Sequence, residues 1–257
     1  MPKMPRIERV RVFAIESPSA LDVFDNRTES HTLQAVCKLL GHEFASTLVR
    51  SEAEFRTALD HLTSVNPTQI PEGERQRPLC LHIAAHGNSG GLGLGGDNLG
   101  WEDLADCLWG FFRRIEHYPG LIILVISACG ASEQKLTSSF QRKAKKSGAP
   151  KPPAYVITTV GDDAGEVNWS DSVVAWSIFY HQIGNAAVYR KEDIQLILDK
   201  IQIVGAGRLK YFRWDSAKET YFHYVSTAKE HSRQTGAFKA GTSAAKPKPS
   251  GRRSGGK

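Results

Sequence analysis

Apolar and polar residues follow two different periods along this chain, and the two periods alternate. Stretches that are apolar at every second position, or apolar throughout, predict β-strands. Stretches that are apolar at every third or fourth position predict amphipathic helices. Five segments have the strand pattern: 9–16, 44–49, 79–86, 121–129 and 154–160. Six have the helix pattern: 32–40, 51–62, 101–115, 132–145, 170–183 and 192–204.

Strands that alternate with helices indicate a mostly parallel sheet, because the crossover between two parallel strands usually contains a helix. The helices then cover both faces of the sheet, and we expect an α/β fold of three layers. A polar loop separates the first strand from the first helix. Near the end, segments 210–214 and 220–225 alternate aromatic and polar residues and predict a closing hairpin.

Residues at the ends of three predicted helices fit capping patterns. Gly41 follows segment 32–40 and Gly205 follows segment 192–204, where a glycine commonly ends a helix. Ser51 and Glu54 have the spacing of a capping box, which indicates that a helix starts there.

The two most apolar strand segments each end in a side chain capable of catalysis, followed at once by glycine. Segment 79–86 ends in His86 and segment 121–129 ends in Cys129. In an open α/β sheet, ligands bind outside the carboxyl ends of neighbouring parallel strands. Two such strands would bring an imidazole and a thiol together at one edge of the sheet. A cysteine nucleophile with a histidine base requires this arrangement.

Other histidines and cysteines in these segments fit a structural role. Cys37 and Cys80 lie in apolar stretches, where a cysteine usually behaves as a small hydrophobic side chain. His82 alternates with the apolar residues of its strand and shares a face with His86. We interpret His82 as a core histidine or a neighbour of the site rather than as the base.

Composition narrows the class of protein. The chain has 257 residues, of which 40% are hydrophobic, enough for one large domain or two small ones. No apolar stretch approaches the roughly 20 residues of a membrane-spanning helix, and segment 1–10 lacks the apolar region of a secretory signal. The four cysteines have no CxxC spacing, which argues against a zinc site and a disulfide framework. We therefore expect a cytoplasmic protein with reduced thiols and with no metal, cofactor or membrane partner.

The positive charge is concentrated at the C-terminal end of the chain. The net charge is +6, yet segment 233–257 holds seven Lys and Arg residues and no acidic one. The rest of the chain is therefore close to neutral. Segment 231–257 is rich in small and polar residues, and we expect it to be a disordered tail. It contains a single aromatic residue, Phe238, which gives no stacking platform, so we expect no functional nucleic-acid binding.

The residues around the histidine and the cysteine resemble those of caspase-like cysteine peptidases, and in particular the bacterial CHAT branch. One strand ends in Ala-Ala-His-Gly at 84–87 and the next in Ser-Ala-Cys-Gly at 127–130, with 43 residues between His86 and Cys129. Caspases have a comparable separation of about 50 residues. Segments 156–159, 168–171 and 179–180 are similar to the CHAT stretch that follows the next strand. Ser127 stands where caspases have glutamine, and Ala131 follows Gly130; both departures point away from true caspases.

This resemblance implies a caspase-like three-layer sandwich over residues 1–230, with cysteine endopeptidase activity through a Cys-His dyad. Cys129 would match the nucleophile and His86 the general base, and the backbone amide of Gly87 would help to hold the oxyanion. The fold requires no third catalytic residue, and we assign none. The substrate would be a protein or peptide. Because CHAT proteins often act in bacterial stress or antiviral responses beside a sensor, the resemblance also implies a separate activating protein.

Acidic residues after segment 154–160 are candidates for substrate recognition. The acidic residues are Asp162, Asp163, Glu166 and Asp171. Such clusters are usually solvated loops. The alternative is a pocket, with Trp169 as its apolar wall, that selects a basic residue on the N-terminal side of the scissile bond. Arg27 lies in the loop after the first strand, roughly where caspases place an arginine that favours acidic residues, so the opposite preference also stays open.

Two other functions stay open on the sequence. One is a catalytically inactive caspase-like module that binds or regulates a partner. The other is a nucleotide-binding domain, because segment 91–96 matches GxGxxG. That signature acts where it directly follows the first strand and opens a helix. Here it follows a mid-sheet strand, and segment 97–100 suits a tight β-turn. We therefore expect a glycine-rich hairpin beside the cleft.

Overall fold

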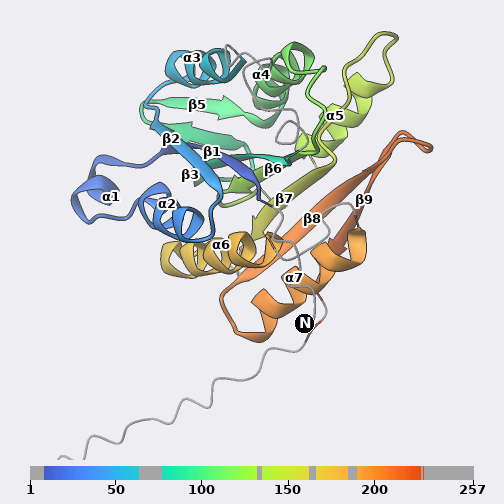
Figure 1. Ribbon diagram of the computed structural model, residues 1–257. Coiled ribbons are helices and arrows are strands. Elements are labelled where there is room, and N and C mark those ends of the chain that lie inside the picture. The colour runs from blue at the N-terminus through green and yellow to red at the C-terminus, as the bar shows by residue number, and fades with distance from the viewer. Residues whose placement is uncertain are drawn as a thin grey trace, which may run out of the picture.

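A computed structural model describes residues 9–63, 77–131, 135–161, 166–184, 190–226 and 228. Within these residues the strands form one sheet in the order β2-β1-β3-β6-β7-β8-β9, and a hairpin of β4 and β5 is attached to β3 (Figure 1). Five neighbouring strands are parallel: β2 (Glu43–Leu48), β1 (Arg11–Ser17), β3 (Leu79–Gly87), β6 (Ile122–Ser127) and β7 (Tyr155–Val160). The last two are antiparallel: β8 (Arg208–Asp215) and β9 (Thr220–Val225). The mostly parallel sheet and its closing hairpin are confirmed.

Helices cover both faces of the sheet (Figure 1). On one face lie α3 (Glu52–Thr63), α4 (Trp101–Arg114) and α5 (Lys135–Ala144). On the other lie α2 (Glu29–Leu39), α6 (Trp169–Ile183) and α7 (Lys191–Ile203). The short helix α1 (Ala20–Phe24) follows β1 and has no buried residue. The expected three-layer α/β sandwich is therefore confirmed.

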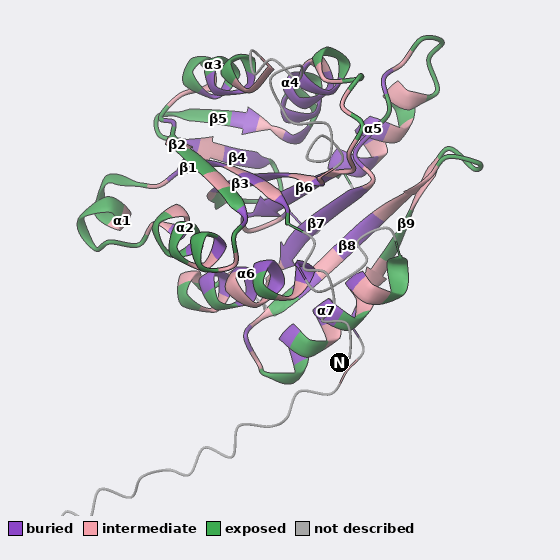
Figure 2. Cartoon of the chain, viewed as in Figure 1, coloured by how far each residue is buried: buried purple, intermediate pink, exposed green. Residues whose placement is uncertain are grey.

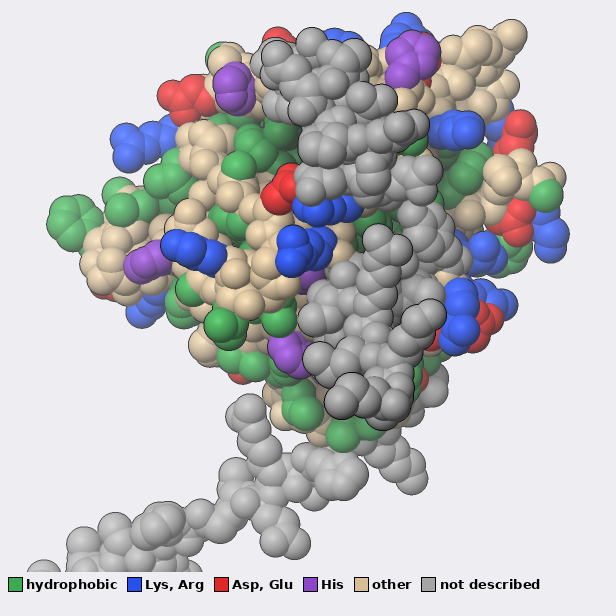
Figure 3. All heavy atoms as spheres, viewed as in Figure 1, with side chains coloured by type: hydrophobic (Ala, Val, Ile, Leu, Met, Phe, Trp, Pro, Cys, Tyr) green, Lys and Arg blue, Asp and Glu red, His purple; other side chains and the backbone are tan. Residues whose placement is uncertain are grey.

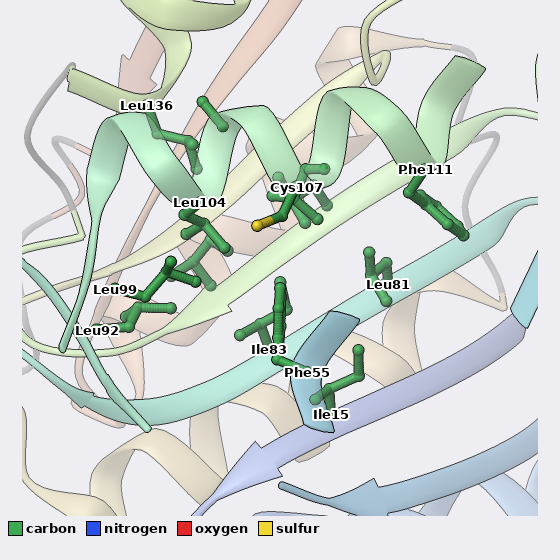
Figure 4. Close-up of a cluster of buried hydrophobic side chains, with 14 of the residues drawn as sticks. Ile15, Phe55, Leu81, Ile83, Leu92, Leu99, Leu104, Cys107, Phe111 and Leu136 are labelled. Atoms are coloured by element: carbon green, nitrogen blue, oxygen red, sulfur yellow. The ribbon is translucent and has the colours of Figure 1, made fainter. Parts of the chain in front are cut away.

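A hydrophobic cluster fills the space between the sheet and α4 (Figure 4). Leu81 and Ile83 of β3 point to this face because side chains alternate along a strand. They pack with Leu104 and Phe111 of α4. Burial of one such side chain stabilises the fold by about 1.5–3 kcal/mol. This packing anchors β3, the strand that carries His86.

The opposite face of the sheet has its own cluster. Cys80 of β3 and Cys37 of α2 are fully buried there, together with Trp176 of α6. In Figure 2 the sides of α2 and α6 that face the sheet are buried and their outer sides are exposed. The interpretation of Cys37 and Cys80 as small core side chains is confirmed.

Helix α2 begins at Glu29, three residues before the expected start. Its N-cap residue, Thr28, makes no side-chain capping bond. The carboxylate of Glu16, at the end of β1, instead accepts the backbone N–H groups of Glu29 at 2.6 Å and of Ser30 at 3.1 Å. Because this cap comes from another element, no local sequence pattern predicts it. At the other end, the expected glycine stop is confirmed, with Gly41 at φ 71°.

The capping box expected at the start of α3 forms in part. Ser51 Oγ accepts the backbone N–H of Glu54 at 3.1 Å. The carboxylate of Glu54 accepts the N–H of Arg50 at 2.6 Å rather than that of Ser51. The other predicted strands and helices are present, with bounds within three residues of those expected.

The glycine-rich segment forms a hairpin, as expected. β4 (Gly91–Leu94) pairs antiparallel with β5 (Asp97–Gly100), and the turn consists of Gly95 and Gly96. The β-turn expected at 97–100 is wrong, because the two glycines already reverse the chain and the next residues return as a strand. The GxGxxG segment is therefore a strand–turn–strand unit and lacks the form of a dinucleotide-binding loop.

Two expectations fall outside the described residues: the basic tail at 231–257, and the acidic pair Asp162 and Asp163. Of the helices that the structure describes, none combines the length and the apolar character needed to cross a bilayer.

Candidate active site

His86 and Cys129 lie at the ends of adjacent strands. β3 and β6 pair in parallel, with Ala84 opposite Ser127. His86 is the penultimate residue of β3, and Cys129 lies in the turn two residues after β6 ends, so both residues follow the paired strands to the same edge of the sheet. Both line one cleft, together with residues of α2 and α6. The structure thus brings the imidazole and the thiol into one site.

The glycines that follow these residues let the two strand ends approach each other. A Cβ atom at Gly87 would lie 2.6 Å from the carbonyl oxygen of Cys129. Gly130 has a φ of 72°, and a Cβ atom there would lie 2.4 Å from the carbonyl carbon of Asn88. Real Cβ atoms essentially never approach other atoms within 3.0 Å. A side chain at either position would therefore push the His86 and Cys129 segments apart.

Cys129 differs from the other three cysteines in its exposure. Cys37, Cys80 and Cys107 are buried, whereas Cys129 is partly exposed. Burial raises the pKa of Cys37 to about 12 and also raises the pKa of Cys80 and Cys107, which makes these thiols unreactive. The sulfur of Cys129 accepts the backbone N–H of Val167 at 3.3 Å. Cys129 is therefore the thiol that a substrate or reagent can reach.

Strand β7 holds the residue that precedes Cys129. Thr159 Oγ1 accepts the N–H of Ala128 at 3.1 Å and donates to the carbonyl of Ala128 at 2.9 Å. Because the backbone N–H and carbonyl of Ala128 both bond to this one buried hydroxyl, the turn that carries Cys129 is fixed against β7.

The imidazole of His86 is 69% exposed and is held by Asp22 of α1. His86 Nε2 donates to Asp22 Oδ2 at 2.7 Å. The same oxygen accepts the backbone N–H of Ser19 at 2.9 Å and its hydroxyl at 2.5 Å. Burial opposes ionisation of Asp22, but the hydrogen bonds from Ser19 and His86 outweigh it and lower the pKa of Asp22. A carboxylate therefore faces the imidazole.

Asp22 is absent from the residues predicted from the sequence, because the segment after the first strand has the composition of a polar loop. The spacing of Ser19 and Asp22, three residues apart, is that of a capping box and indicates the start of a helix, but it does not indicate the contact with His86.

A buried cluster of Glu29, His82, Ser127 and Ser172, here called the polar floor, lies under the cleft. Glu29 Oε1 accepts the hydroxyls of Ser127 at 2.6 Å and Ser172 at 2.7 Å. Glu29 Oε2 accepts His82 Nε2 at 2.9 Å, and the other ring nitrogen of His82 bonds the hydroxyl of Tyr180 at 3.0 Å. His82 is thus a core histidine, as interpreted. The polar floor ties α2, β3, β6 and α6 together beneath the dyad.

The described residues among those predicted for substrate recognition divide between two adjoining depressions. Trp169 lines the cleft of His86 and Cys129. Asp171 lines the next depression, which shares Val167 with the first. Arg27, on which the opposite preference depends, also lines the first cleft.

The cleft is small, and two of its lining residues carry buried polar atoms without a partner among the described residues. Its volume of about 110 Å³ is below the roughly 300–1,000 Å³ of typical small-molecule sites. Two of its buried polar atoms, Ser17 Oγ and Trp169 Nε1, have no hydrogen-bond partner within the part of the chain that the structure describes. Across the same described ranges, no group of three or more His, Cys, Asp or Glu side chains could hold a metal ion.

The chain was compared with family models, curated proteins and solved structures, and only the solved structures gave a match. No family model matches the sequence, and no curated protein is significantly similar to it. Among solved structures the chain is similar to caspase-1 from Spodoptera frugiperda, with a TM-score of 0.49 and 12% sequence identity, over 90% of this chain and 96% of that chain.

Proposed function

We propose that this chain is a cysteine endopeptidase of the caspase-like type, in the CHAT branch, with Cys129 as nucleophile and His86 as general base. The observation that carries the proposal is the presence of both residues in one cleft, at the ends of two adjacent parallel strands. Nucleophilic catalysis by cysteine needs a thiol and a base side by side. The burial of the other three cysteines supports Cys129 as the reactive thiol.

The proposed reaction proceeds through an acyl-enzyme. His86 takes the thiol proton, since a free thiol is mostly protonated at neutral pH, and Cys129 Sγ attacks the carbonyl carbon of the peptide bond. The backbone N–H of Gly87 is the proposed donor to the oxyanion; one such donor contributes about 2.7–4 kcal/mol. The C–N bond then breaks, and His86 gives its proton to the departing amine. Water, activated by His86, hydrolyses the thioester and restores the thiol.

Charges around the cleft support selection of a basic residue on the N-terminal side of the scissile bond. The described lining residues include three carboxylates, from Glu16, Asp22 and Glu29, and one guanidinium, from Arg27. Arg27 Nη2 also lies 3.3 Å from a carboxylate oxygen of Asp25. Glu16 and Glu29 are buried and hydrogen-bonded within the fold, so in this proposal they attract a lysine or arginine side chain through their field at the cleft rather than by direct contact. In this proposal Asp162, Asp163 and Asp171 extend the acidic rim, and Trp169 is the apolar wall.

Matched peptides test this selectivity. Two fluorogenic peptides that differ only in the residue before the scissile bond, Arg or Asp, are expected to differ about tenfold or more in kcat/KM, in favour of Arg, as one favourable charge interaction would produce. Arg27→Ala is expected to increase that ratio, because it removes the opposing charge. If the wild type instead preferred the Asp peptide and Arg27→Ala abolished that preference, the proposed selectivity would be contradicted. The proposed peptidase activity would be unaffected by that result.

Competitive labelling of the cysteines tests the activity itself. With limiting iodoacetamide and peptide mapping, we expect Cys129 to be modified about tenfold or more faster than Cys37, Cys80 or Cys107, since only a reachable thiolate reacts quickly. Modification of Cys129 is expected to stop hydrolysis of a fluorogenic peptide pool. Equal labelling of all four cysteines would contradict the proposal. Fast labelling without any hydrolysis would favour an inactive module that binds a partner.

A further inference from the structure

We propose that Asp22 is a positioning residue of the catalytic centre, so that α1 supplies a carboxylate that orients His86 toward Cys129. This inference rests on the proposed cysteine chemistry and adds a third residue to the dyad. Its basis is the 2.7 Å bond from His86 Nε2 to Asp22 Oδ2, between residues 64 positions apart in the sequence.

His86 needs such a partner because little else restrains its ring. The imidazole is 69% exposed, whereas His82, four residues earlier in the same strand, is buried in the polar floor. An exposed side chain keeps several rotamers unless a directional contact selects one. The bond to Asp22 selects the rotamer that places the ring in the cleft with Cys129.

Asp22 itself is held by polar contacts rather than by packing. Ser19 donates its N–H and its hydroxyl to Asp22 Oδ2, and the N–H of Asp22 donates to Ser19 Oγ at 3.2 Å. The apolar side chains of α1 give little anchorage, because Leu21 is 74% exposed and Phe24 is 84% exposed. Figure 2 shows most of α1 as exposed, and Figure 3 shows hydrophobic side chains standing out at this end of the molecule. The capping box and the ion pair thus determine where the carboxylate lies.

The bond also fixes which ring nitrogen acts as the base. A carboxylate only accepts hydrogen bonds, so Nε2 carries the proton and Nδ1 has the free lone pair. Nδ1 is therefore the atom that takes the thiol proton. When it does, the negative charge of Asp22 stabilises the imidazolium that forms, as the orienting carboxylate of a catalytic triad does.

The test compares Asp22→Asn with the wild-type chain. We expect kcat for a fluorogenic peptide to fall about 10- to 1,000-fold with little change in KM, because an orienting carboxylate acts on the reaction and not on substrate binding. We also expect the pH of half-maximal Cys129 alkylation to rise by about 0.5 unit, since an exposed charge pair has a modest effect. Ser19→Ala is expected to move both quantities in the same direction by less.

Asp60→Asn is the matched control. Asp60 is a surface aspartate paired with Arg114 on the opposite face of the sheet, so its variant should behave as wild type. An Asp22→Asn chain with unchanged kcat and an unchanged alkylation profile would overturn the inference. The inference would also be overturned if Asp22→Asn lost activity only because its melting temperature fell, while the pH dependence of Cys129 alkylation stayed unchanged. A wild-type chain without hydrolysis would overturn the proposed function, whereas the alkylation profile would still decide the role of Asp22.

Discussion

Replacement of His86 by alanine is expected to lower kcat/KM for peptide hydrolysis by about 10²–10⁴-fold, the usual contribution of a general acid–base residue. Two steps lose their proton carrier: formation of the thiolate, and protonation of the departing amine. The variant should keep the stability of the wild type, because the His86 side chain is 69% exposed and contributes no packing to the core. The rate is measured with the peptide that the wild type hydrolyses best, and the fold by thermal melting.

His117→Ala serves as the control for that experiment. The side chain of His117 is 90% exposed and follows α4, ahead of the amino end of β6, so it lies away from the carboxyl edge of the sheet. We expect this variant to hydrolyse peptide at the wild-type rate. If His86→Ala also kept more than half of the wild-type rate, His86 would not be the base.

Replacement of Glu29 by alanine is expected to lower the free energy of unfolding by about 3–5 kcal/mol, as removal of one partner from a buried ionic network does. Glu29 is 5% exposed and accepts hydrogen bonds from His82, Ser127 and Ser172. Its removal leaves these three buried donors without their acceptor. Equilibrium unfolding in urea measures the change.

Two further substitutions show that the effect comes from the buried network. Glu29→Gln keeps one acceptor oxygen and should cost less, about 1–3 kcal/mol. Glu52→Ala removes a surface carboxylate whose partner is Arg56, one turn away on α3, and should change stability by no more than about 0.5 kcal/mol. A Glu29→Ala chain that unfolds within 1 kcal/mol of the wild type would show that the polar floor does not hold the sheet and helices together.

The part of the site that the sequence predicts is the part that follows from strand periodicity. His86 and Cys129 end two apolar runs of similar length, and parallel strands present their carboxyl ends at one edge. In the structure β3 and β6 pair in parallel, and the two side chains line one cleft at that edge. Periodicity therefore suffices to bring this pair of residues together.

Residues that act through contacts between distant elements give no such local signal. Glu29 lies in the polar loop expected before segment 32–40, yet it is the acceptor at the centre of the polar floor. Glu16 ends an apolar strand and caps α2 from outside that helix. Asp22 lies in a segment with the composition of a loop, and only the folded chain brings it to His86.

By itself, the order of apolar and polar residues determined the alternation of strands and helices, the mostly parallel sheet, and the edge at which an imidazole and a thiol meet. Hydrophobic burial explains this, since it depends on local periods of two and 3.6 residues. Tertiary structure alone decided the order of the strands, the cap on α2, the composition of the polar floor and the carboxylate beside His86. Each of these depends on hydrogen bonds between residues far apart in the chain, whose partners are chosen only when the elements pack.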